Sequence, residues 1–519
     1  MDKNIIAAGD KTTVEAAKEI LWLGGNAYDA AVAAVFTSMT AEPTLTSLGG
    51  GGHFMAYPSG SKPILFDFFV DMPSGVIEPK QMEFFDIEVD FGPEQQQFHI
   101  GKGSIAVPGT AAGLLHVHKG LGKLERKDLM APAIRAAKEG TVLSDAQAYL
   151  VKILAPILNY ETAGRRLFSP DERLLQTGDR LAIPDLADFL DGLACEGVDL
   201  MYKGEVADRI VEWVGEEGFL RKADLEQYEV KERAPITTNF FGHKVYLNPP
   251  PAISGILVDF TFCLLEQVIL SPGASIELKD VALALSMTNE ARRNKLPEGT
   301  VMSGRSRFCM DKDFQTYVED FQTYVEDFPT KRPRGDNNQE PTSRGATTQV
   351  SILDTGGNAA SVTTTNGEGC GYILPGLGFM LNNMLGEEDL NPHGFHLHKP
   401  GDRLPSMVAP TIVTKDGVPV MVTGSAGSNR IRSAIVQVIT NVLCGGMEKK
   451  AAFVAPRIHV EGDTLQVEPG VNEVQLRKLT DFFEIHQWNE MNLYFGGANS
   501  VTSYGGAGDP RRGGAAATV

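Results

Sequence analysis

The stretch Gly345-Ala346-Thr347-Thr348-Gln349-Val350-Ser351 joins a polar segment to an alternating apolar run. Upstream, residues 329–341 contain three prolines and almost no apolar side chains, which predicts an exposed, flexible segment. Downstream, two runs rich in β-formers flank a Gly-containing turn at residues 354–358. The sequence therefore predicts a hairpin whose first strand begins at Thr347, directly after a loop in which the chain can be cut.

A threonine hydroxyl is a weak nucleophile unless a base lies beside it. A threonine at an N-terminus carries such a base in its own α-amine, whose ordinary pKa is about 8. That terminus has to be made by cutting the chain in front of the threonine. Thr347 has the position for this role, although most Thr-Thr pairs at a loop-strand junction are simply strand formers.

The hairpin resembles the start of the small subunit of γ-glutamyltransferases, where such a threonine is both the processing site and the nucleophile. The resemblance rests on Thr347-Thr348-Gln349-Val350-Ser351, Asp354, Gly357-Asn358 and Ser361-Val362-Thr363. It extends over most of the chain through motifs in matching order: residues 24–31, Glu42-Pro43, residues 49–52, Pro108-Gly109-Thr110, Pro249-Pro250-Pro251, Leu381-Asn382-Asn383, Ala409-Pro410-Thr411, Gly424-Ser425 and Asp509-Pro510-Arg511.

The resemblance implies an α+β fold of the N-terminal-nucleophile hydrolase type. This fold is a four-layer αββα sandwich, in which two stacked, mostly antiparallel sheets are flanked by helices. It also implies one precursor that cuts itself between Ala346 and Thr347. Residues 1–346 would form the large subunit and 347–519 the small one, and the two should stay associated as a heterodimer because neither buries its sheet alone.

The resemblance assigns four catalytic residues. Thr347 supplies the hydroxyl and the amine, and Thr365 on the returning strand matches the threonine that hydrogen-bonds the nucleophile. Gly427 and Ser428 match two consecutive glycines whose backbone N–H groups face the developing oxyanion. Ser428 replaces the second glycine, and it keeps the donor if it can adopt the required backbone angles.

The acyl pocket fits the family less well. Typical members bind the donor's α-carboxylate with an arginine and two serines, whereas this chain offers Lys102, a point charge without the guanidinium fork, and Ser406 alone. The family binds the donor's α-amine with an asparagine, a Glu or Gln, and an aspartate. Here Asn366 matches the asparagine and Met384 replaces the polar residue.

The residue that matches the aspartate is either Glu388 or Asp389, because one residue is inserted before them.

The leading functional hypothesis is a γ-glutamyltransferase or glutathione hydrolase. Such an enzyme acts on γ-glutamyl amides such as glutathione through an acyl-threonine that water or an amine resolves. A second hypothesis, motivated by the missing arginine and by Met384, is an acylase of the same fold for another amide. A third is an unprocessed, non-catalytic binding protein. No cofactor is needed for the proposed reaction.

Composition limits the partners and the compartment. The chain has 519 residues, 42% of them hydrophobic, and a formal charge of −19, which disfavours nucleic acid and anionic membranes as partners. No apolar run approaches about 18 residues and no signal peptide is visible. Five widely spaced cysteines without a Cys-x-x-Cys pair predict free thiols. We therefore expect a cytoplasmic protein.

Two motifs leave alternatives open. Gly49-Gly50-Gly51-Gly52 is interpreted as a tight backbone approach near the active centre rather than a phosphate cradle, because no Lys-Ser or Lys-Thr follows. His393, His396 and His398 alternate as zinc ligands would on a strand, but a surface loop is favoured and no metal site is predicted. Residues 249–255 either form a structural turn or line the site.

Several elements are predicted from local pattern. We expect a helix from Thr13 to Leu23 with Thr13 as N-cap, a surface excursion over residues 78–99 and a strand over residues 104–107. The Gly- and Ala-rich tail should fray beyond Arg512. The heptapeptide Phe-Gln-Thr-Tyr-Val-Glu-Asp occurs twice within residues 314–327 and is interpreted as a tolerated duplication.

Overall fold

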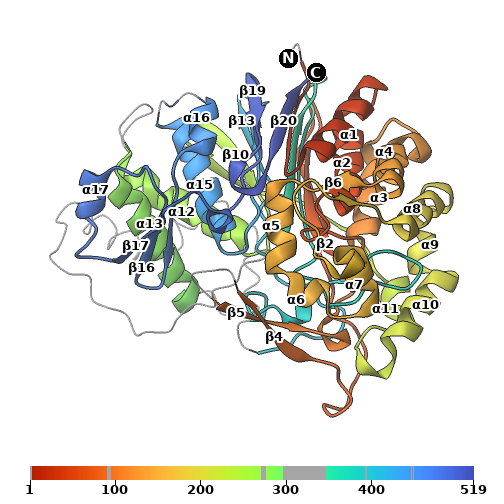
Figure 1. The fold of residues 1–519 in the computed structure, drawn as a ribbon. Coiled ribbons are helices and arrows are strands. Elements are labelled where there is room, and N and C mark those ends of the chain that lie inside the picture. The colour runs from red at the N-terminus through yellow and green to blue at the C-terminus, as the bar shows by residue number, and fades with distance from the viewer. Residues whose placement is uncertain are drawn as a thin grey trace.

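The computed structural model describes residues 3–90, 95–269, 276–295, 346–391, 394–445, 447 and 449–519. The duplicated heptapeptide and His393 lie outside these residues. The two ends of the chain lie side by side (Figure 1). They are joined by backbone hydrogen bonds in both directions between Asn4 and Val519, each 2.8 Å.

One seven-stranded antiparallel sheet carries the predicted hairpin. Its strands, in spatial order, are β20 (Ala515–Thr518), β1 (Ile5–Ala8), β11 (Thr347–Leu353), β12 (Ala359–Thr365), β2 (Gly51–Tyr57), β3 (Ile64–Phe68) and β8 (Lys231–Arg233). The hairpin strands β11 and β12 are central in this sheet and every residue in them is buried.

A second antiparallel sheet has six strands. In spatial order they are β19 (Gly505–Ala507), β18 (Ser500–Thr502), β14 (Val418–Thr423), β13 (Thr411–Lys415), β10 (His243–Leu247) and β9 (Ile236–Phe240). Apolar side chains of both sheets form one buried cluster between them, which includes Ile5, Met55, Leu353, Ile412 and Val422. The two sheets are therefore stacked face to face.

Helices cover both outer faces (Figure 1). On the first sheet lie α1 (Lys11–Trp22), α2 (Ala27–Ala41) and α3 (Thr110–Leu121), while α4 (Arg126–Glu139) packs on α2 and α8 (Pro184–Glu196) packs on α4. On the second lie α12 (Ser254–Val268), α13 (Leu278–Lys295) and α15 (Arg430–Leu443). The predicted four-layer αββα sandwich is confirmed.

Smaller elements surround these layers. The helices are α5 (Asp145–Ile153), α6 (Ala155–Leu158), α7 (Thr162–Phe168), α9 (Asp199–Tyr202), α10 (Gly204–Val214), α11 (Lys222–Glu226), α16 (Lys449–Val454) and α17 (Glu473–Arg477). The strands are β4 (Phe85–Asp90), β5 (Gln95–Ile100), β6 (Thr141–Val142), β7 (Arg180–Leu181), β15 (Ile458–Glu461), β16 (Thr464–Val467) and β17 (Glu484–Gln487).

Both sheets combine strands from the two sides of Thr347. In the first sheet, β11 and β12 lie between β1 and β2, and β20 flanks β1. In the second, β13 lies between β14 and β10. Because each sheet draws strands from residues before and after Thr347, a cut at this position leaves the two halves joined by backbone ladders and shared cores.

Helix α2 is rich in small residues and lies directly on the sheet that contains Thr347. Asn26 caps it, with Oδ1 accepting from the backbone of Tyr28 and Asp29, while Asp29 accepts from the Asn26 backbone N–H. All fifteen of its residues are buried, because small alanines let it pack against β11 and β12 on one side and α4 on the other.

Four local predictions are wrong. Asp10, not Thr13, caps α1, which begins at Lys11, because a carboxylate reaches the backbone of Thr12 at 2.6 Å. The strand predicted over residues 104–107 is absent, because residues 102–104 form a short 3-10 helix, η1; the predicted surface excursion over residues 78–99 contains the β4–β5 hairpin. The tail does not fray, because β20 pairs with β1.

The fourth error concerns the cysteines. Cys263 is disulfide-bonded, whereas Cys195, Cys370 and Cys444 are free thiols. The prediction that all five are free is therefore wrong at Cys263.

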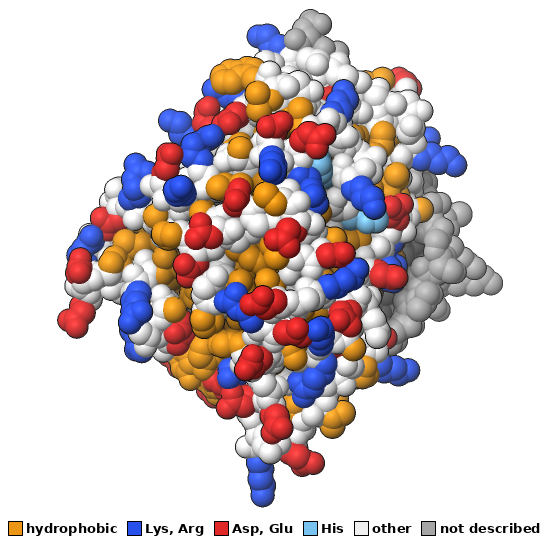
Figure 2. Space-filling model, turned by 90° about the vertical axis from the view of Figure 1, so that its right-hand side faces the viewer, with side chains coloured by type: hydrophobic (Ala, Val, Ile, Leu, Met, Phe, Trp, Pro, Cys, Tyr) orange, Lys and Arg blue, Asp and Glu red, His pale blue; other side chains and the backbone are white. Residues whose placement is uncertain are grey.

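The surface is mixed in charge. Figure 2 shows Lys and Arg side chains interspersed with Asp and Glu over the face that is on the right in Figure 1. Within the described part of the chain, no helix combines the length and the apolar character that crossing a bilayer requires.

Candidate active site

Thr347 is the first residue of β11 and pairs with Thr365, the last residue of β12. It is 3% exposed. Successive side chains of a strand point to opposite faces, so Thr347 and Thr348 face opposite sides of the sheet. The predicted nucleophile and its predicted threonine partner are thus brought together by strand register alone.

Ala346, the residue in front of Thr347, is held through both its carbonyl oxygen and its N–H. The Thr365 hydroxyl donates a short hydrogen bond to the Ala346 carbonyl oxygen and accepts one from Gly367 N at 3.1 Å. The backbone N–H of Ala346 donates to Glu368 Oε1 at 3.3 Å. Ala346 itself is 4% exposed, so this junction is fixed inside the protein.

On the opposite face of β11, Thr348 is anchored by Glu42. The Thr348 hydroxyl donates to Glu42 Oε2 at 2.7 Å, and Thr13 donates to Oε1 at 3.1 Å. Burial, with a smaller contribution from Asp10, raises the pKa of Glu42 to about 8. A neutral, doubly hydrogen-bonded carboxyl group therefore fixes the strand that carries the nucleophile.

The Gly-rich segment at residues 49–52 packs directly against the end of β12. A Cβ on Gly50 would lie 2.2 Å from the Thr365 carbonyl oxygen. The Gly50 carbonyl accepts from the backbone N–H of Gly109 and Thr110, at 2.8 and 3.1 Å. The interpretation of this motif as a close backbone approach near the active centre is confirmed.

The loop after β14 carries the two predicted oxyanion donors. Gly427 has φ 112° and Ser428 has φ 48°, both in the region that favours glycine. Ser428 is held there because its hydroxyl donates a short hydrogen bond to Asp389. Among the described residues, no acceptor takes the backbone N–H of Gly427 or Ser428, so both donors are available to a ligand.

This loop is supported by the C-terminal segment. Ala426 pairs with Gly497 through two backbone hydrogen bonds of 3.2 Å, and Ala498 N donates to Asp509 Oδ2 at 2.7 Å.

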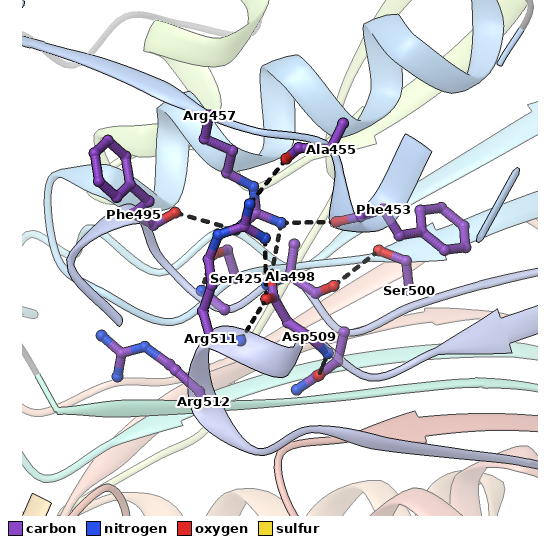
Figure 3. Close-up of polar contacts among 12 residues, drawn as sticks. Ser425, Phe453, Ala455, Arg457, Phe495, Ala498, Ser500, Asp509, Arg511 and Arg512 are labelled. Atoms are coloured by element: carbon purple, nitrogen blue, oxygen red, sulfur yellow. Dashed lines mark hydrogen bonds and ion pairs between the residues drawn. The ribbon is translucent and has the colours of Figure 1, made fainter. Parts of the chain in front are cut away.

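Asp509 is the centre of a buried ion network. Figure 3 shows Arg457 and Arg511 converging on its carboxylate, with distances of 2.6 and 3.2 Å. Arg511 also pairs with Glu468 at 2.5 Å. These arginines hold the pKa of Asp509 below its ordinary value in spite of burial. The Asp509-Pro510-Arg511 motif thus has a structural role: its ion pairs fix the segment against which the Gly427 loop packs.

Three acidic side chains gather beside Ala346. Burial raises the pKa of Glu368 to about 8, and burial together with the Glu368 charge raises the pKa of Glu387 above its ordinary range. Asp389 accepts from Asn429 Nδ2 at 2.9 Å as well as from Ser428. The acids thus connect the Ala346 junction to the Gly427 loop.

The predicted donor-binding residues are only partly brought together. Asp389 lies in this acidic cluster, whereas the alternative, Glu388, is exposed. Asn366 is buried next to Thr365, and its Nδ2 donates to the Leu381 carbonyl at 3.4 Å. Ser406 is buried, and its hydroxyl accepts from Val408 N at 3.1 Å.

Lys102 is engaged elsewhere. Its Nζ pairs with Glu217 at 2.5 Å and lies 5.3 Å from the centre of the Trp213 ring. Met384 is fully buried in an apolar cluster with Leu385, Leu390 and other residues. The turn at residues 249–255 contacts the Ser406 segment through a 2.9 Å hydrogen bond from Ile253 N to the Ser406 carbonyl.

Sequence reasoning missed Glu368 and Glu387 as members of the cluster. Their neighbours in the sequence could have indicated that both acids are buried. Glu368 is two residues beyond Asn366 in a turn of three glycines, and Glu387 directly follows the buried segment that contains Met384. Acids in such a setting are rarely placed in the interior without a function.

No metal site is found in the described part of the chain, where no three His, Cys, Asp or Glu side chains gather as ligands. His396 Nε2 instead donates to the Gly103 carbonyl at 2.9 Å, and the ring packs on those of Phe84 and Phe219.

Comparisons with known proteins agree with this geometry. The glutathione hydrolase proenzyme of Pseudomonas aeruginosa is 30% identical over 491 residues, 88% of this chain and 83% of the relative. The acylase ACY 1 proenzyme of Pseudomonas sp. strain SE83 is 27% identical over 473 residues, 89% and 84% of the two chains. The crystal structure of the cephalosporin acylase from Bacillus halodurans shares the fold, with a TM-score of 0.82 at 22% identity over 99% of this chain and 95% of that one.

The model of the gamma-glutamyltranspeptidase family matches residues 13–519. This match shows that the chain belongs to the gamma-glutamyltranspeptidase family.

Proposed function

We propose that this protein is a precursor that cuts itself before Thr347 and then transfers or hydrolyses the acyl group of γ-glutamyl amides such as glutathione. The observation that carries the proposal is the buried Thr347 paired with Thr365, whose hydroxyl contacts the carbonyl of the bond to be cut. The proenzyme names of the relatives support it.

Self-cleavage begins when Thr347 Oγ1 attacks the Ala346 carbonyl carbon. A C–O bond forms and the C–N bond to Thr347 breaks, and the hydroxyl proton ends on the released nitrogen. Water then hydrolyses the resulting ester, so that Ala346 leaves as a carboxylate and Thr347 regains its hydroxyl. The Thr365 hydroxyl polarises the carbonyl that is attacked.

In the mature protein, the free α-amine of Thr347 takes the proton from its own hydroxyl as that oxygen attacks the substrate amide. The N–H groups of Gly427 and Ser428 stabilise the oxyanion, and an acyl-threonine forms as the amine leaves. Water or a second amine resolves this acyl-enzyme. Residues 1–346 and 347–519 would remain a heterodimer because each part contributes strands to both sheets.

Recognition of a γ-glutamyl donor is assigned to the acids and amides beside Thr347. Asn366 and Asp389 would accept hydrogen bonds from the donor's α-amino group, because Asn366 Oδ1 is buried without a partner among the described residues and Asp389 lies in the same cluster. Ser406, and Lys102 if its side chain leaves Glu217, would serve the α-carboxylate. Glu388 would act from the rim of the pocket.

A second candidate is an acylase for an amide without a free α-amino acid, as one group of relatives is named. Two observations favour it: the Lys102 ammonium is paired with Glu217, and Met384 is buried among apolar side chains. Turnover of γ-glutamyl anilide, glutaryl anilide and a simple acyl anilide separates the candidates. A strong preference for γ-glutamyl anilide supports the first, and a preference for glutaryl or simple acyl groups supports the second.

The Thr347→Ala variant tests the shared part of both candidates. It should remain one full-length chain and lose amidase activity by at least about 10³-fold, because the variant lacks the nucleophile. A variant that is still cut at this position, or still active, would contradict the assignment. A wild-type chain that stays intact would favour the non-catalytic binding protein.

A cytoplasmic location stays a prediction from the sequence. The Cys263 disulfide removes part of its basis, because the argument relied on five free thiols.

A further inference from the structure

Ala346, the residue in front of the bond to be cut, has both of its backbone groups bound by side chains from beyond the nucleophile. Its carbonyl accepts from Thr365 and its N–H donates to Glu368 Oε1 at 3.3 Å. The mechanism above uses the first contact. It leaves the second, made by a buried acid, without a role.

Glu368 is fixed in position by a tight turn. Its own N–H and that of Gly369 both donate to Asn383 Oδ1, at 2.9 and 3.1 Å. Asn383 in turn donates to the His99 carbonyl at 3.3 Å. The carboxyl group therefore points toward Ala346 because the turn is anchored.

The surroundings of Glu368 keep it neutral at physiological pH. The titratable groups whose charges act on it are Glu387 and Asp389, both acids. From β5, His99 contributes only a backbone carbonyl, since its ring stacks on Phe84. A buried acid that faces two other acids retains its proton to higher pH than usual.

The neutral carboxyl can accept and donate at once. Oε1 accepts from Ala346, whereas Oε2 is buried and has no partner among the described residues. A charged carboxylate here would oppose the oxyanion that forms on Ala346, while a neutral acid would not.

We propose that Glu368 is a positioning residue for self-cleavage, whose carboxyl group holds the Ala346 N–H so that the adjoining carbonyl carbon faces Thr347 Oγ1. This inference rests on the proposed self-cleavage before Thr347 and adds the device that aligns the bond. Glu368 takes no part in bond making or breaking. Burial, with a smaller contribution from Asp389, favours the uncharged form that suits this task.

The test follows the loss of full-length chain with time, by mass spectrometry under denaturing conditions, for the full-length protein. Glu368→Ala removes the acceptor and should slow self-cleavage by at least about 10-fold, the equivalent of one neutral hydrogen bond. Glu368→Gln keeps an acceptor oxygen in the same place and should restore the rate to within about threefold of wild type. A purely structural role for the charge would not show this rescue.

The pH profile supplies a second readout that does not depend on the alanine variant. Above pH about 8 the wild-type Glu368 ionises, whereas the amide of the Glu368→Gln variant cannot. The ratio of the wild-type rate to the Glu368→Gln rate should therefore fall between pH 7 and pH 9. A ratio that stays constant, or a folded Glu368→Ala variant cut at the wild-type rate, would overturn the proposal.

Asp280→Asn is the matched control, because Asp280 is also a buried acid with a raised pKa but belongs to α13 on the other outer layer. It should be cut at the wild-type rate, and a slowed control would mean that any lost buried acid has this effect, against the proposal. Failure of the proposed function is distinguishable, since then the wild type itself is not cut before Thr347.

Discussion

The nucleophile hairpin and the acyl pocket differ in how their residues are positioned. Thr347 and Thr365 are adjacent because two consecutive strands of one sheet pair in a single register. The pocket residues come instead from loops and short turns, where one inserted residue changes which side chain points inward. In the segment after Met384, Glu387 and Asp389 are buried and Glu388 between them is exposed. The sheet therefore places the threonines predicted to be catalytic, whereas loops place the residues predicted to select the substrate.

The largest expected effect is on the hairpin itself. Thr365→Ala should slow self-cleavage by at least about 10²-fold, because the Ala346 carbonyl loses the hydroxyl that polarises it. Thr365→Ser should recover most of the rate, since the hydroxyl is kept. The remaining full-length chain, measured over time, reports both. Equal rates for the alanine variant and the wild type would break the link between strand register and catalysis.

The next largest effect is expected in the loop that contains Gly427 and Ser428. Gly427→Ala should reduce kcat by about 10²-fold with little change in KM, because alanine cannot hold φ 112° without strain and the oxyanion donor moves. Ser428→Gly is the matched control and should retain kcat within about threefold, since the donor remains and glycine favours this conformation. The reverse order of effects would show that these N–H groups are not the oxyanion donors.

A substitution among the residues predicted to bind the donor should change the preference between two substrates. Asp389→Asn should raise KM for γ-glutamyl anilide by about 10-fold, or about 1.4 kcal/mol, because a negative charge facing the donor's amino group is lost. The KM for glutaryl anilide, which has no amino group, should change far less. Parallel changes for the two substrates would exclude Asp389 from amine recognition.

The smallest effect is expected for Glu42, on the face of β11 opposite Thr347, and it concerns the pH dependence of stability. Glu42 has a folded-state pKa raised to about 8, so the folded protein binds a proton that the unfolded chain releases near pH 4.5. Stability should therefore fall as pH rises from about 5 to about 8. Glu42→Gln cannot ionise, so its Tm should exceed that of the wild type by a few degrees more at pH 8 than at pH 5. The same pH dependence of Tm in the wild type and in the Glu42→Gln variant would contradict a raised pKa for Glu42.

The same contrast explains what could be predicted from the sequence. The hairpin, its start at Thr347 and its pairing with Thr365 follow from local strand and turn patterns joined to a family resemblance. The αββα layers follow from that resemblance too. These features depend on periods of two residues and on motifs that are contiguous in the chain.

Other features depend on contacts between distant segments and could not be predicted in this way. The Lys102 ammonium is paired with Glu217, which is 115 residues away in the sequence. The last strand, β20, is ordered by pairing with β1 at the other end of the chain. The raised pKa of Glu368 depends on its burial, with a smaller contribution from Asp389, and both arise only when the loop between them folds.

The central claim is that Thr347 becomes a new N-terminus. The most direct measurement is the intact mass of the purified wild-type protein under denaturing conditions after incubation at neutral pH, together with the N-terminal sequence of the smaller species. The account predicts two species that divide the chain between Ala346 and Thr347, the smaller beginning Thr-Thr-Gln-Val-Ser. A single full-length species that nevertheless hydrolyses an amide would contradict it.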